Sequence, residues 1–362
     1  MGSESSACGD LIVGGYHGEA PTPRFTAAIA RGERAGAILF KRNGRAPIEM
    51  WRHTRALTEA AGDRRLVLAV DQEGGRVERI GPPLLQLPAA RRLAAACELP
   101  LVELVAETQA RELAAVGFST SFAPVLDVAS EPKNPIIGDR AFGETAEAAI
   151  PAALAFARGL ERGRIFACGK HFPGHGATQQ DSHLELPVVS RAEAAVRAVD
   201  VEPFARAAAA AMPAMMSAHV VFTALDPERP ATLSRAICTD LLRGELRFTG
   251  VLFSDDLEMK ALTQPVEETA VLAVAAGCDM LLVCSDEDAQ DRAYAALVRE
   301  AERSEAFRAR VAEAAARSRD LRERFAPAPC RTEAELADAL GRHEAVGKAL
   351  AERLEALAAR GG

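Results

Sequence analysis

Eight short apolar runs recur along this 362-residue chain, and their spacing limits the possible folds more than any other feature. Each run is rich in Val, Ile, Leu or Phe and has the length of a buried strand. Alanine-rich stretches with a helical spacing of apolar residues lie between most of them. The runs are "LIVGG" (11–15), "GAILF" (36–40), "LVLAVD" (66–71), "STSFAPVLDV" (119–128), "IFACGKHF" (165–172), "AMMSAHVVF" (214–222), "GVLFSDDL" (250–257) and "CDMLLVC" (278–284).

Strands that alternate with helices in this way predict an α/β fold, namely a single (β/α)8 barrel of the TIM type. A doubly wound sheet is the alternative. Such a sheet should carry a Gly-rich phosphate turn after its first strand, and "VGGYHGEAP" (13–21) does not have the G-x-G-x-x-G pattern. The barrel is therefore the preferred prediction.

Polar residues cluster where the predicted strands end. TIM barrels build their active sites on the face formed by the carboxyl ends of the strands. We therefore expect these side chains to line one site. They are Asp71, Asp127, His171, His219, Asp255 and Asp256.

The C-terminal part of the chain carries a separate helical pattern. The last long helix of the barrel is expected over about 297–325, and "APAPC" (326–330) then interrupts the chain. This predicts a catalytic barrel over 1–326 and a helical extension over 327–362. Thr332 and Glu335 have the spacing of a capping box and are expected to begin the first helix of the extension. Packing on its own barrel, in a monomer, is the preferred reading of the extension. Packing on a second chain, in a dimer, is the alternative.

Composition excludes several partner classes. The formal net charge of −8 disfavours nucleic acid, and no apolar run reaches the ~20 residues of a membrane helix. The first residues lack the basic and apolar segments of a secretory signal. Seven cysteines, none in a C-x-x-C pair, are typical of reduced thiols in a cytosolic protein. We expect a cytoplasmic protein with no nucleic-acid or membrane partner.

Three of the seven histidines fall in "KHFPGHGATQQDSHLELP" (170–187). His171 and His175 have the i, i+4 spacing of two metal ligands on a helix, but Pro173 and Gly174 make a helix there improbable, so we expect no metal. A Ser–His–Asp triad is also disfavoured, because adjacent side chains point apart and the chain contains no G-x-S-x-G elbow.

The third interpretation of this stretch is a working pair of Asp181 and His183. Residues i and i+2 of an extended segment share a face, so the carboxylate could orient the imidazole and raise its pKa from about 6.5. Such a histidine exchanges protons near neutral pH. A chance Asp-x-His in a surface loop explains the same letters equally well.

Several longer motifs occur together along the chain: "ILFKRN" (38–43), "AVDQEGGRVER" (69–79), "SFAPVLDV" (121–128), "NPIIGDRAFG" (134–143), "KHFPGHG" (170–176), "DSH" (181–183), "MSAHVVF" (216–222), "FSDDLEM" (253–259) and "AGCDMLLVC" (276–284). In this order they resemble the glycoside hydrolase family 3 β-N-acetylglucosaminidases, in particular the bacterial enzymes of peptidoglycan recycling. The resemblance covers about residues 10–325.

The resemblance implies a role for each matching residue. Asp255 falls at the position of the nucleophile, His183 at that of the general acid/base, and Asp181 at that of the residue orienting the histidine. The positions that hold the sugar in the −1 subsite are filled by Asp71, Arg79, Arg140, Lys170 and His171.

The implied activity is that of a retaining exo-β-N-acetylglucosaminidase. It would release terminal non-reducing N-acetylglucosamine from a small carbohydrate substrate, such as a peptidoglycan-derived muropeptide, without a cofactor. Two alternatives remain. A phosphorylase on the same fold is one, because a histidine acid/base would not repel phosphate. A non-catalytic amino-sugar-binding barrel is the other.

Local patterns add expectations about neighbouring residues. Alternation along a strand predicts that Asp255 and Asp256 point to opposite sides, so that only one faces the barrel mouth. Glu73 and Arg76 are expected to form a salt bridge that shapes the Gly74–Gly75 turn. His175 is expected to brace its loop, whereas His219 either lines the site or is a core histidine.

Overall fold

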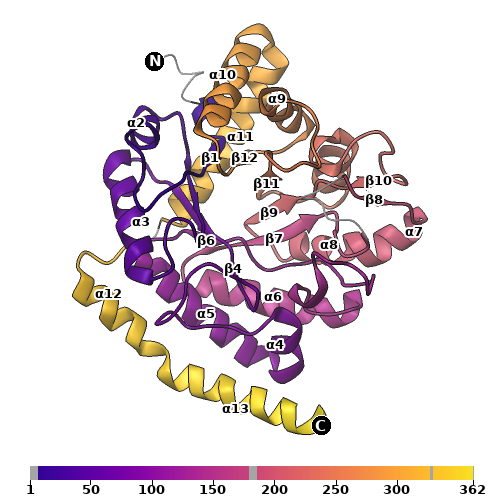
Figure 1. Ribbon diagram of the computed structural model, residues 1–362. Coiled ribbons are helices and arrows are strands. Elements are labelled where there is room, and N and C mark those ends of the chain that lie inside the picture. Colours follow the sequence, from indigo (N-terminus) through magenta and orange to yellow (C-terminus); the bar gives the residue numbers. More distant parts are fainter. Residues whose placement is uncertain (1–6, 179–185, 327–328, 362) are drawn as a thin grey trace.

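The computed structural model describes residues 7–178, 186–326 and 329–361. A closed barrel of eight parallel strands forms its centre, which confirms the predicted fold class (Figure 1). Each of the eight apolar runs supplies one barrel strand. Around the barrel they are β1 (Ile12–Gly14), β12 (Met280–Val283), β11 (Val251–Asp256), β9 (Ala214–Ser217), β7 (Phe166–Phe172), β6 (Thr120–Ser121), β3 (Val67–Val70) and β2 (Gly36–Leu39).

Helices connect consecutive barrel strands and surround them. Local signals set their ends: the Thr22 side chain accepts the Phe25 N–H at the start of α2, and α5 ends at Gly117 with φ 107°. None of the helices in the described part of the chain has the length and apolarity to cross a membrane. The helices are α2 (Pro23–Arg31), α3 (Pro47–Ala61), α4 (Ala90–Ala96), α5 (Leu99–Val116), α6 (Ala146–Arg162), α7 (Glu193–Ala195), η2 (Val196–Val201), α8 (Glu202–Ala209), η4 (Ala236–Glu245), α9 (Val266–Ala276), α10 (Glu287–Arg303) and α11 (Glu305–Arg324).

Short elements outside the barrel decorate its carboxyl-end face. They include two small two-stranded sheets, one of them an antiparallel hairpin that directly follows β3. The remaining elements are β4 (Gln72–Gly74) and β5 (Val77–Glu78) of this hairpin, β8 (Val188–Val189) paired with β10 (Val221–Phe222), and the 3₁₀ turns η1 (Gly138–Arg140) and η3 (Ala231–Leu233).

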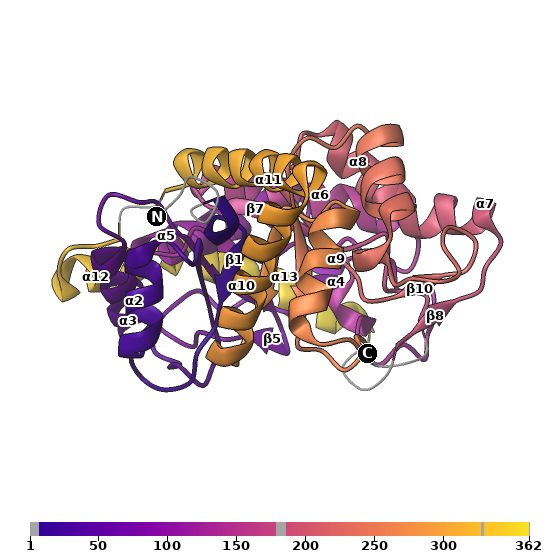
Figure 2. The ribbon, with the colours of Figure 1, turned by 90° about the horizontal axis from the view of Figure 1, so that it is seen from above.

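Aromatic side chains fill the barrel interior. Phe253 contacts Phe122 edge-on at 5.3 Å between ring centroids and stacks on Phe166 at 6.0 Å. Helix α11 closes the end of the barrel opposite the hairpin, with Leu321 in the inner core and Phe325 against Phe166 (Figure 2). The barrel is therefore a packed core, and any site must lie at its open end.

The single helix expected over 297–325 is wrong. The chain forms α10 and α11 instead, which meet at Ser304. The Ser304 side chain accepts the Phe307 N–H at 3.2 Å and so caps the start of α11. A short polar residue within an apolar periodicity was the only sign of this break.

The C-terminal extension consists of α12 (Glu333–Leu340), the 3₁₀ turn η5 (Gly341–His343) and α13 (Glu344–Gly361). It packs against α4 and α5 of its own barrel, which was the preferred expectation (Figure 1). Leu336, Leu340 and Leu350 are buried in this contact, and His343 bonds the buried Glu112 carboxylate at 2.5 Å. Thr332 caps α12 by accepting the Glu335 N–H at 3.2 Å.

Candidate active site

A pocket of about 350 Å³ opens at the carboxyl ends of the barrel strands. It has the size of a small-ligand site. Six of the eight residues assigned by sequence line it, namely Asp71, Arg79, Arg140, Lys170, His171 and Asp255. The other two, Asp181 and His183, lie outside the described residues.

The β4–β5 hairpin places two charged side chains at this pocket. Its turn needs glycine: Gly74 and Gly75 have φ of 109° and 59°, and a Cβ on Gly74 would lie 2.5 Å from the Pro88 carbonyl oxygen. The Gln72 side chain accepts the Arg79 N–H at 2.9 Å and thereby ties the two strands together. The hairpin thus presents Glu73 and Arg79 in fixed positions.

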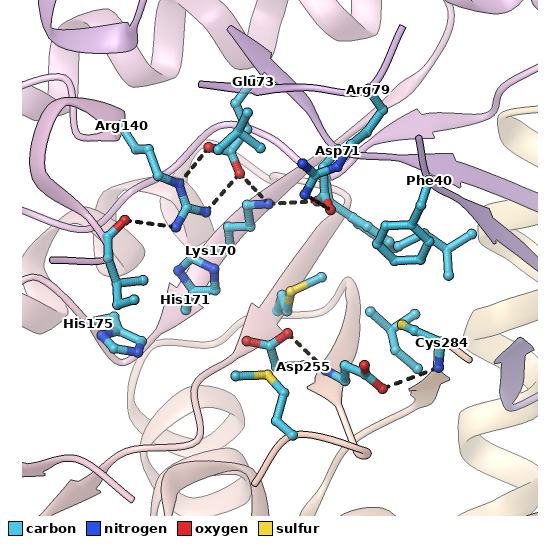
Figure 3. Close-up of a pocket in the computed structure, with 18 of the residues that line it drawn as sticks. Phe40, Asp71, Glu73, Arg79, Arg140, Lys170, His171, His175, Asp255 and Cys284 are labelled. Carbon is cyan, nitrogen blue, oxygen red and sulfur yellow. Dashed lines mark hydrogen bonds and ion pairs between the residues drawn. The ribbon is translucent and has the colours of Figure 1, made fainter. Parts of the chain in front are cut away.

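A buried network of ion pairs forms one wall of the pocket (Figure 3). The Lys170 Nζ lies 3.0 Å from Asp71 Oδ1 and 2.6 Å from Glu73 Oε1. Arg140 binds Glu73 through two parallel bonds of 2.8 Å, and Arg79 lies 3.3 Å from Asp71. Charge-assisted bonds of this kind hold both partners in one geometry.

The expected Glu73–Arg76 salt bridge is therefore wrong. Glu73 points into the pocket toward Arg140, whereas Arg76 pairs with Asp139 at 3.4 Å and donates to the Pro135 carbonyl oxygen at 3.3 Å. The partner of Glu73 is 67 residues away along the chain, and only the folded barrel brings the two together.

The ion pairs keep the carboxyl groups of this wall ionised. Burial alone would raise the pKa of Asp71 and that of Glu73. Lys170 and Arg79 lower the pKa of Asp71, and Arg140 and Lys170 lower that of Glu73, so both pKa values lie below their ordinary range. The same contacts raise the pKa of Lys170 in spite of its burial. The wall offers charged donors and acceptors to the hydroxyl groups of a ligand.

A β-bulge lets two consecutive residues of β7 reach the pocket. Lys170 pairs with Met216 of β9 and Phe172 with Ser217, so that β7 has one extra residue between them. Such a bulge re-aims side chains next to a site. Lys170 and His171 consequently both line the pocket, although strict alternation would send one of them away.

A buried carboxylate fixes the histidines of the pocket. Asp127 accepts the His171 Nδ1–H at 2.7 Å and the backbone N–H of His175 at 2.7 Å. The His171 ring is thereby oriented, with Nε2 as the nitrogen that can reach a ligand. Burial lowers the pKa of His175 to about 4, and its Nδ1 bonds the Thr178 hydroxyl, so it braces the backbone after β7 as expected.

A second bulge lies in β11 and overturns the expected orientation of Asp256. Phe253 pairs with Met280 of β12, whereas Asp256 pairs with Leu282, so that β11 has one residue more than its neighbour. Alternation is broken at this point, and Asp255 and Asp256 both line the pocket. Asp255 lies on the opposite side of the pocket from the ion-pair wall (Figure 3).

Asp255 is held as a carboxylate. One of its oxygens, Oδ1, accepts the backbone N–H of Asp256 at 2.8 Å, which leaves Oδ2 for a ligand. Burial would raise the pKa of Asp255, but its electrostatic interactions with His171 and His219 and the hydrogen bond from the Asp256 N–H outweigh this, so the pKa lies below its usual value. A partly buried anion that faces a polar wall is suited to stabilise or attack a positive centre.

His219 is a buried residue beside the site. Its Nε2–H donates to the Asp256 carbonyl oxygen at 2.9 Å, and its Nδ1 lies 2.8 Å from the Thr232 hydroxyl. His219 is absent from the lining of the pocket, and of the two roles left open the core histidine therefore applies, with a bracing contact to the end of β11.

Sequence reasoning gave no site role to several residues that line the pocket. Phe40 forms part of the wall near Arg79, whose guanidinium lies 5.9 Å from the ring centroid. Glu73 had been assigned to a structural salt bridge, and Asp256 stands at a strand end but was expected to point away from the barrel mouth, yet both line the pocket. The "ILFKRN" motif contained Phe40, but a hydrophobic residue at a strand end carries no chemical signal by itself. Among the described residues, no three His, Cys, Asp or Glu side chains are grouped as a metal site.

Comparison with protein families gives one match over most of the chain. The family described as "Glycosyl hydrolase family 3 N terminal domain" matches residues 20–321. A curated relative, the beta-hexosaminidase of Alkalilimnicola ehrlichii, is 43% identical over 265 residues, which are 70% of this chain and 74% of the relative.

Solved structures give the same picture. A glycoside hydrolase family 3 β-N-acetylglucosaminidase from Paenibacillus sp. str. FPU-7 matches with a TM-score of 0.87 at 32% identity, over 98% of this chain and 69% of the other. NagZ from Neisseria gonorrhoeae, in complex with N-trifluoroacetyl-D-glucosamine, matches with a TM-score of 0.71 at 31% identity, over 86% of this chain and 98% of the other.

Proposed function

The chain belongs to glycosyl hydrolase family 3, and from this premise we propose that it is a retaining exo-β-N-acetylglucosaminidase. The observation that carries the proposal is the placement of Asp255, a partly buried ionised carboxylate that faces the ion-pair wall across a pocket of about 350 Å³. The named relatives, a beta-hexosaminidase and a β-N-acetylglucosaminidase, support the amino-sugar specificity. Peptidoglycan-derived muropeptides are the proposed substrate class.

Asp255 is the proposed nucleophile. Its Oδ1 is occupied by the Asp256 N–H, so Oδ2 attacks the anomeric carbon and forms a covalent glycosyl-enzyme. The aglycone leaves with its glycosidic oxygen. Water then attacks the same carbon, which releases the sugar with its original configuration and regenerates the carboxylate.

The ion-pair wall holds the sugar during both steps. Asp71 accepts hydrogen bonds from ring hydroxyls, whereas Lys170, Arg79 and the His171 Nε2 complete the contacts. Arg140 acts at least partly through Glu73, which it clamps against Lys170. Because these groups are fixed before the substrate arrives, binding does not have to order them.

We assign the general acid/base to His183, with Asp181 as its orienting partner. Both lie outside the described residues, so sequence and resemblance carry this assignment. The imidazolium would protonate the leaving oxygen and the imidazole would then take a proton from water. His171, which Asp127 orients, also presents an imidazole to the pocket and is therefore the rival for this role.

Substitution of these two histidines separates their roles. We expect His183→Ala to lower kcat/KM by about 10²–10⁴-fold for a disaccharide, whose leaving group needs a proton, and far less for a nitrophenyl glycoside. His171→Ala should lower both values together, because it removes a contact to the sugar. Steady-state kinetics on both substrates would measure this. Equal losses in His183→Ala would remove the acid role.

The proposed activity itself is tested with an aryl β-N-acetylglucosaminide. The protein should release the aryl alcohol, and nuclear magnetic resonance should detect the β-anomer of N-acetylglucosamine first. Product analysis in phosphate buffer should give free sugar and no sugar phosphate, which separates hydrolysis from phosphorolysis. No release at any pH would favour a binding protein.

We also propose that the enzyme acts in the cytoplasm. All seven cysteines lie in the described residues and none forms a disulfide, and six of them are buried. Reduced thiols of this kind are typical of a reducing compartment.

A further inference from the structure

We infer that Asp256, as a carboxylic acid, donates a hydrogen bond to the carbonyl oxygen of the sugar's 2-acetamido group and so selects N-acylated amino sugars. The inference rests on the proposed function, because it names the group that reads the 2-substituent in the same pocket. Neither the sequence motifs nor the ion-pair wall account for this part of the specificity.

The position of the Asp256 carboxyl group is the first argument. The bulge in β11 turns it into the pocket next to Asp255. Its Oδ1 accepts two backbone N–H groups, those of Glu258 and Cys284, each at 3.2 Å. Its Oδ2 has no hydrogen-bond partner within residues 7–178, 186–326 and 329–361. One oxygen is therefore anchored, and the other is available to a ligand.

The order of the ring atoms is the second argument. Asp255 attacks C1, and the C2 substituent is attached to the neighbouring ring carbon. The ion-pair wall lies on the other side of the pocket, where the hydroxyl groups distant from C1 would bind (Figure 3). The carboxyl group that follows Asp255 along the chain is thus placed on the side of the 2-substituent.

The surroundings of Asp256 suit an acetamido group as a whole. Met259, Leu282 and Cys284 line the same pocket, and the Cys284 label in Figure 3 lies on the Asp255 side. Their apolar and sulfur-bearing side chains can cover a methyl group. A hydrogen-bonding group beside an apolar surface matches an amide that ends in a methyl group.

The charges around Asp256 favour its acid form. Burial and the charges of Glu258 and Asp255 raise the pKa of Asp256 to about 7. Arg42 faces the group from the segment after β2 and acts in the opposite direction, although its guanidinium also serves the Cys284 and Tyr16 carbonyl oxygens. The remaining neighbours are Cys284 and His219, which bonds the Asp256 carbonyl oxygen. The donor proton is present below about pH 7 and is lost above it.

An Asp256→Asn substitution imitates the acid form. The two backbone N–H groups of Glu258 and Cys284 need an acceptor, so the amide oxygen takes the place of Oδ1. The NH₂ group then faces the pocket and remains a donor at every pH. Asp256→Ala, in contrast, removes the donor.

The test compares competitive inhibition by N-acetylglucosamine with that by glucose, during hydrolysis of an aryl β-N-acetylglucosaminide between pH 6 and pH 8.5. The ratio of the two inhibition constants cancels the contacts that both sugars share. In the wild type we expect the preference for N-acetylglucosamine to fall about tenfold over this range. In Asp256→Asn the preference should stay at the wild-type value of pH 6, and in Asp256→Ala it should be about tenfold lower throughout.

Two further variants test the origin of the pH dependence and serve as a control. Glu258→Gln removes one charge that raises the pKa of Asp256, so the fall in preference should move to lower pH. Asp320→Asn makes the same chemical change as Asp256→Asn at an exposed residue of α11 that pairs with Arg324 away from the pocket, and should reproduce the wild-type curve.

The outcomes separate this inference from the proposed function. A wild type that hydrolyses the substrate with a preference independent of pH, or an Asp256→Asn variant as unselective as Asp256→Ala, would overturn the role of Asp256 alone. A wild type that hydrolyses no aryl β-N-acetylglucosaminide would overturn the proposed function instead.

Discussion

Replacing Asp255 by Asn is expected to lower kcat/KM by at least about 10⁴-fold on both aryl and disaccharide substrates. The amide is a poor nucleophile and carries no negative charge, so the oxocarbenium-like transition state loses both its attacking group and its counter-charge. Steady-state kinetics would measure the loss. The substitution keeps the size of the side chain, and the thermal midpoint of unfolding should change little.

A covalent trap distinguishes a nucleophile from a residue that only supports the site. Incubation with a 2-fluoro substrate analogue should attach the sugar to Asp255 in the wild type, and peptide mass spectrometry should locate it. Asp320→Asn is the matched control, since this exposed aspartate of α11 pairs with Arg324, and neither residue lines the pocket. A trapped sugar on Asp256 or on any other residue would contradict the mechanism.

Glu73→Gln is expected to reduce the free energy of unfolding by about 3–5 kcal/mol at pH 7. The change removes the negative charge that pairs with the guanidinium of Arg140 and with the buried ammonium group of Lys170. Burial of a charge without its partner is more costly than the loss of an exposed pair. Urea-induced unfolding of the two proteins would measure the difference.

The pH dependence of this difference provides a second check. The folded pKa of Glu73 lies below its unfolded value, so the carboxylate stabilises the fold above about pH 4.3 and this contribution disappears as the pH falls through the folded pKa. The difference in the free energy of unfolding between the wild type and Glu73→Gln should therefore become smaller below pH 4. Glu59→Gln, which removes an exposed pair with Arg55, should change the stability by less than about 0.5 kcal/mol. A Glu73→Gln variant as stable as this control would show that the ion-pair wall is not a stabilising element.

The architecture could be predicted from the sequence because buried strands have a recognisable amino-acid composition. A strand surrounded by helices and other strands must be apolar along its whole length, and runs such as that at 66–71 cannot be mistaken for surface segments. The polar residue that ends a run marks the open end of the barrel. Asp71 and His171 were assigned to that end on this basis, and both line the pocket.

Two predictions about the site were wrong, and in both cases a local sequence pattern did not contain the strand pairing on which the outcome depends. Arg76 is three residues from Glu73, and a local argument therefore joins the two, whereas the barrel gives Glu73 a partner 67 residues away. Alternation predicted that the Asp256 side chain points away from the pocket. Because β11 has one residue more than β12 between their two pairings, the Asp256 side chain points into the pocket instead. A bulge depends on the register of two strands, which a single strand does not encode.

The bulge in β11 has an evolutionary consequence. Deleting the codon of Asp255 would remove the extra residue of β11 and allow regular pairing with β12. The strand would then end in one aspartate instead of two, so a single carboxyl group would have to serve both proposed roles. We expect such a variant to lose hydrolysis before it loses sugar binding, because the Lys170, Asp71 and Glu73 contacts lie outside β11. A single deletion would thus separate sugar binding from hydrolysis in a descendant of this chain.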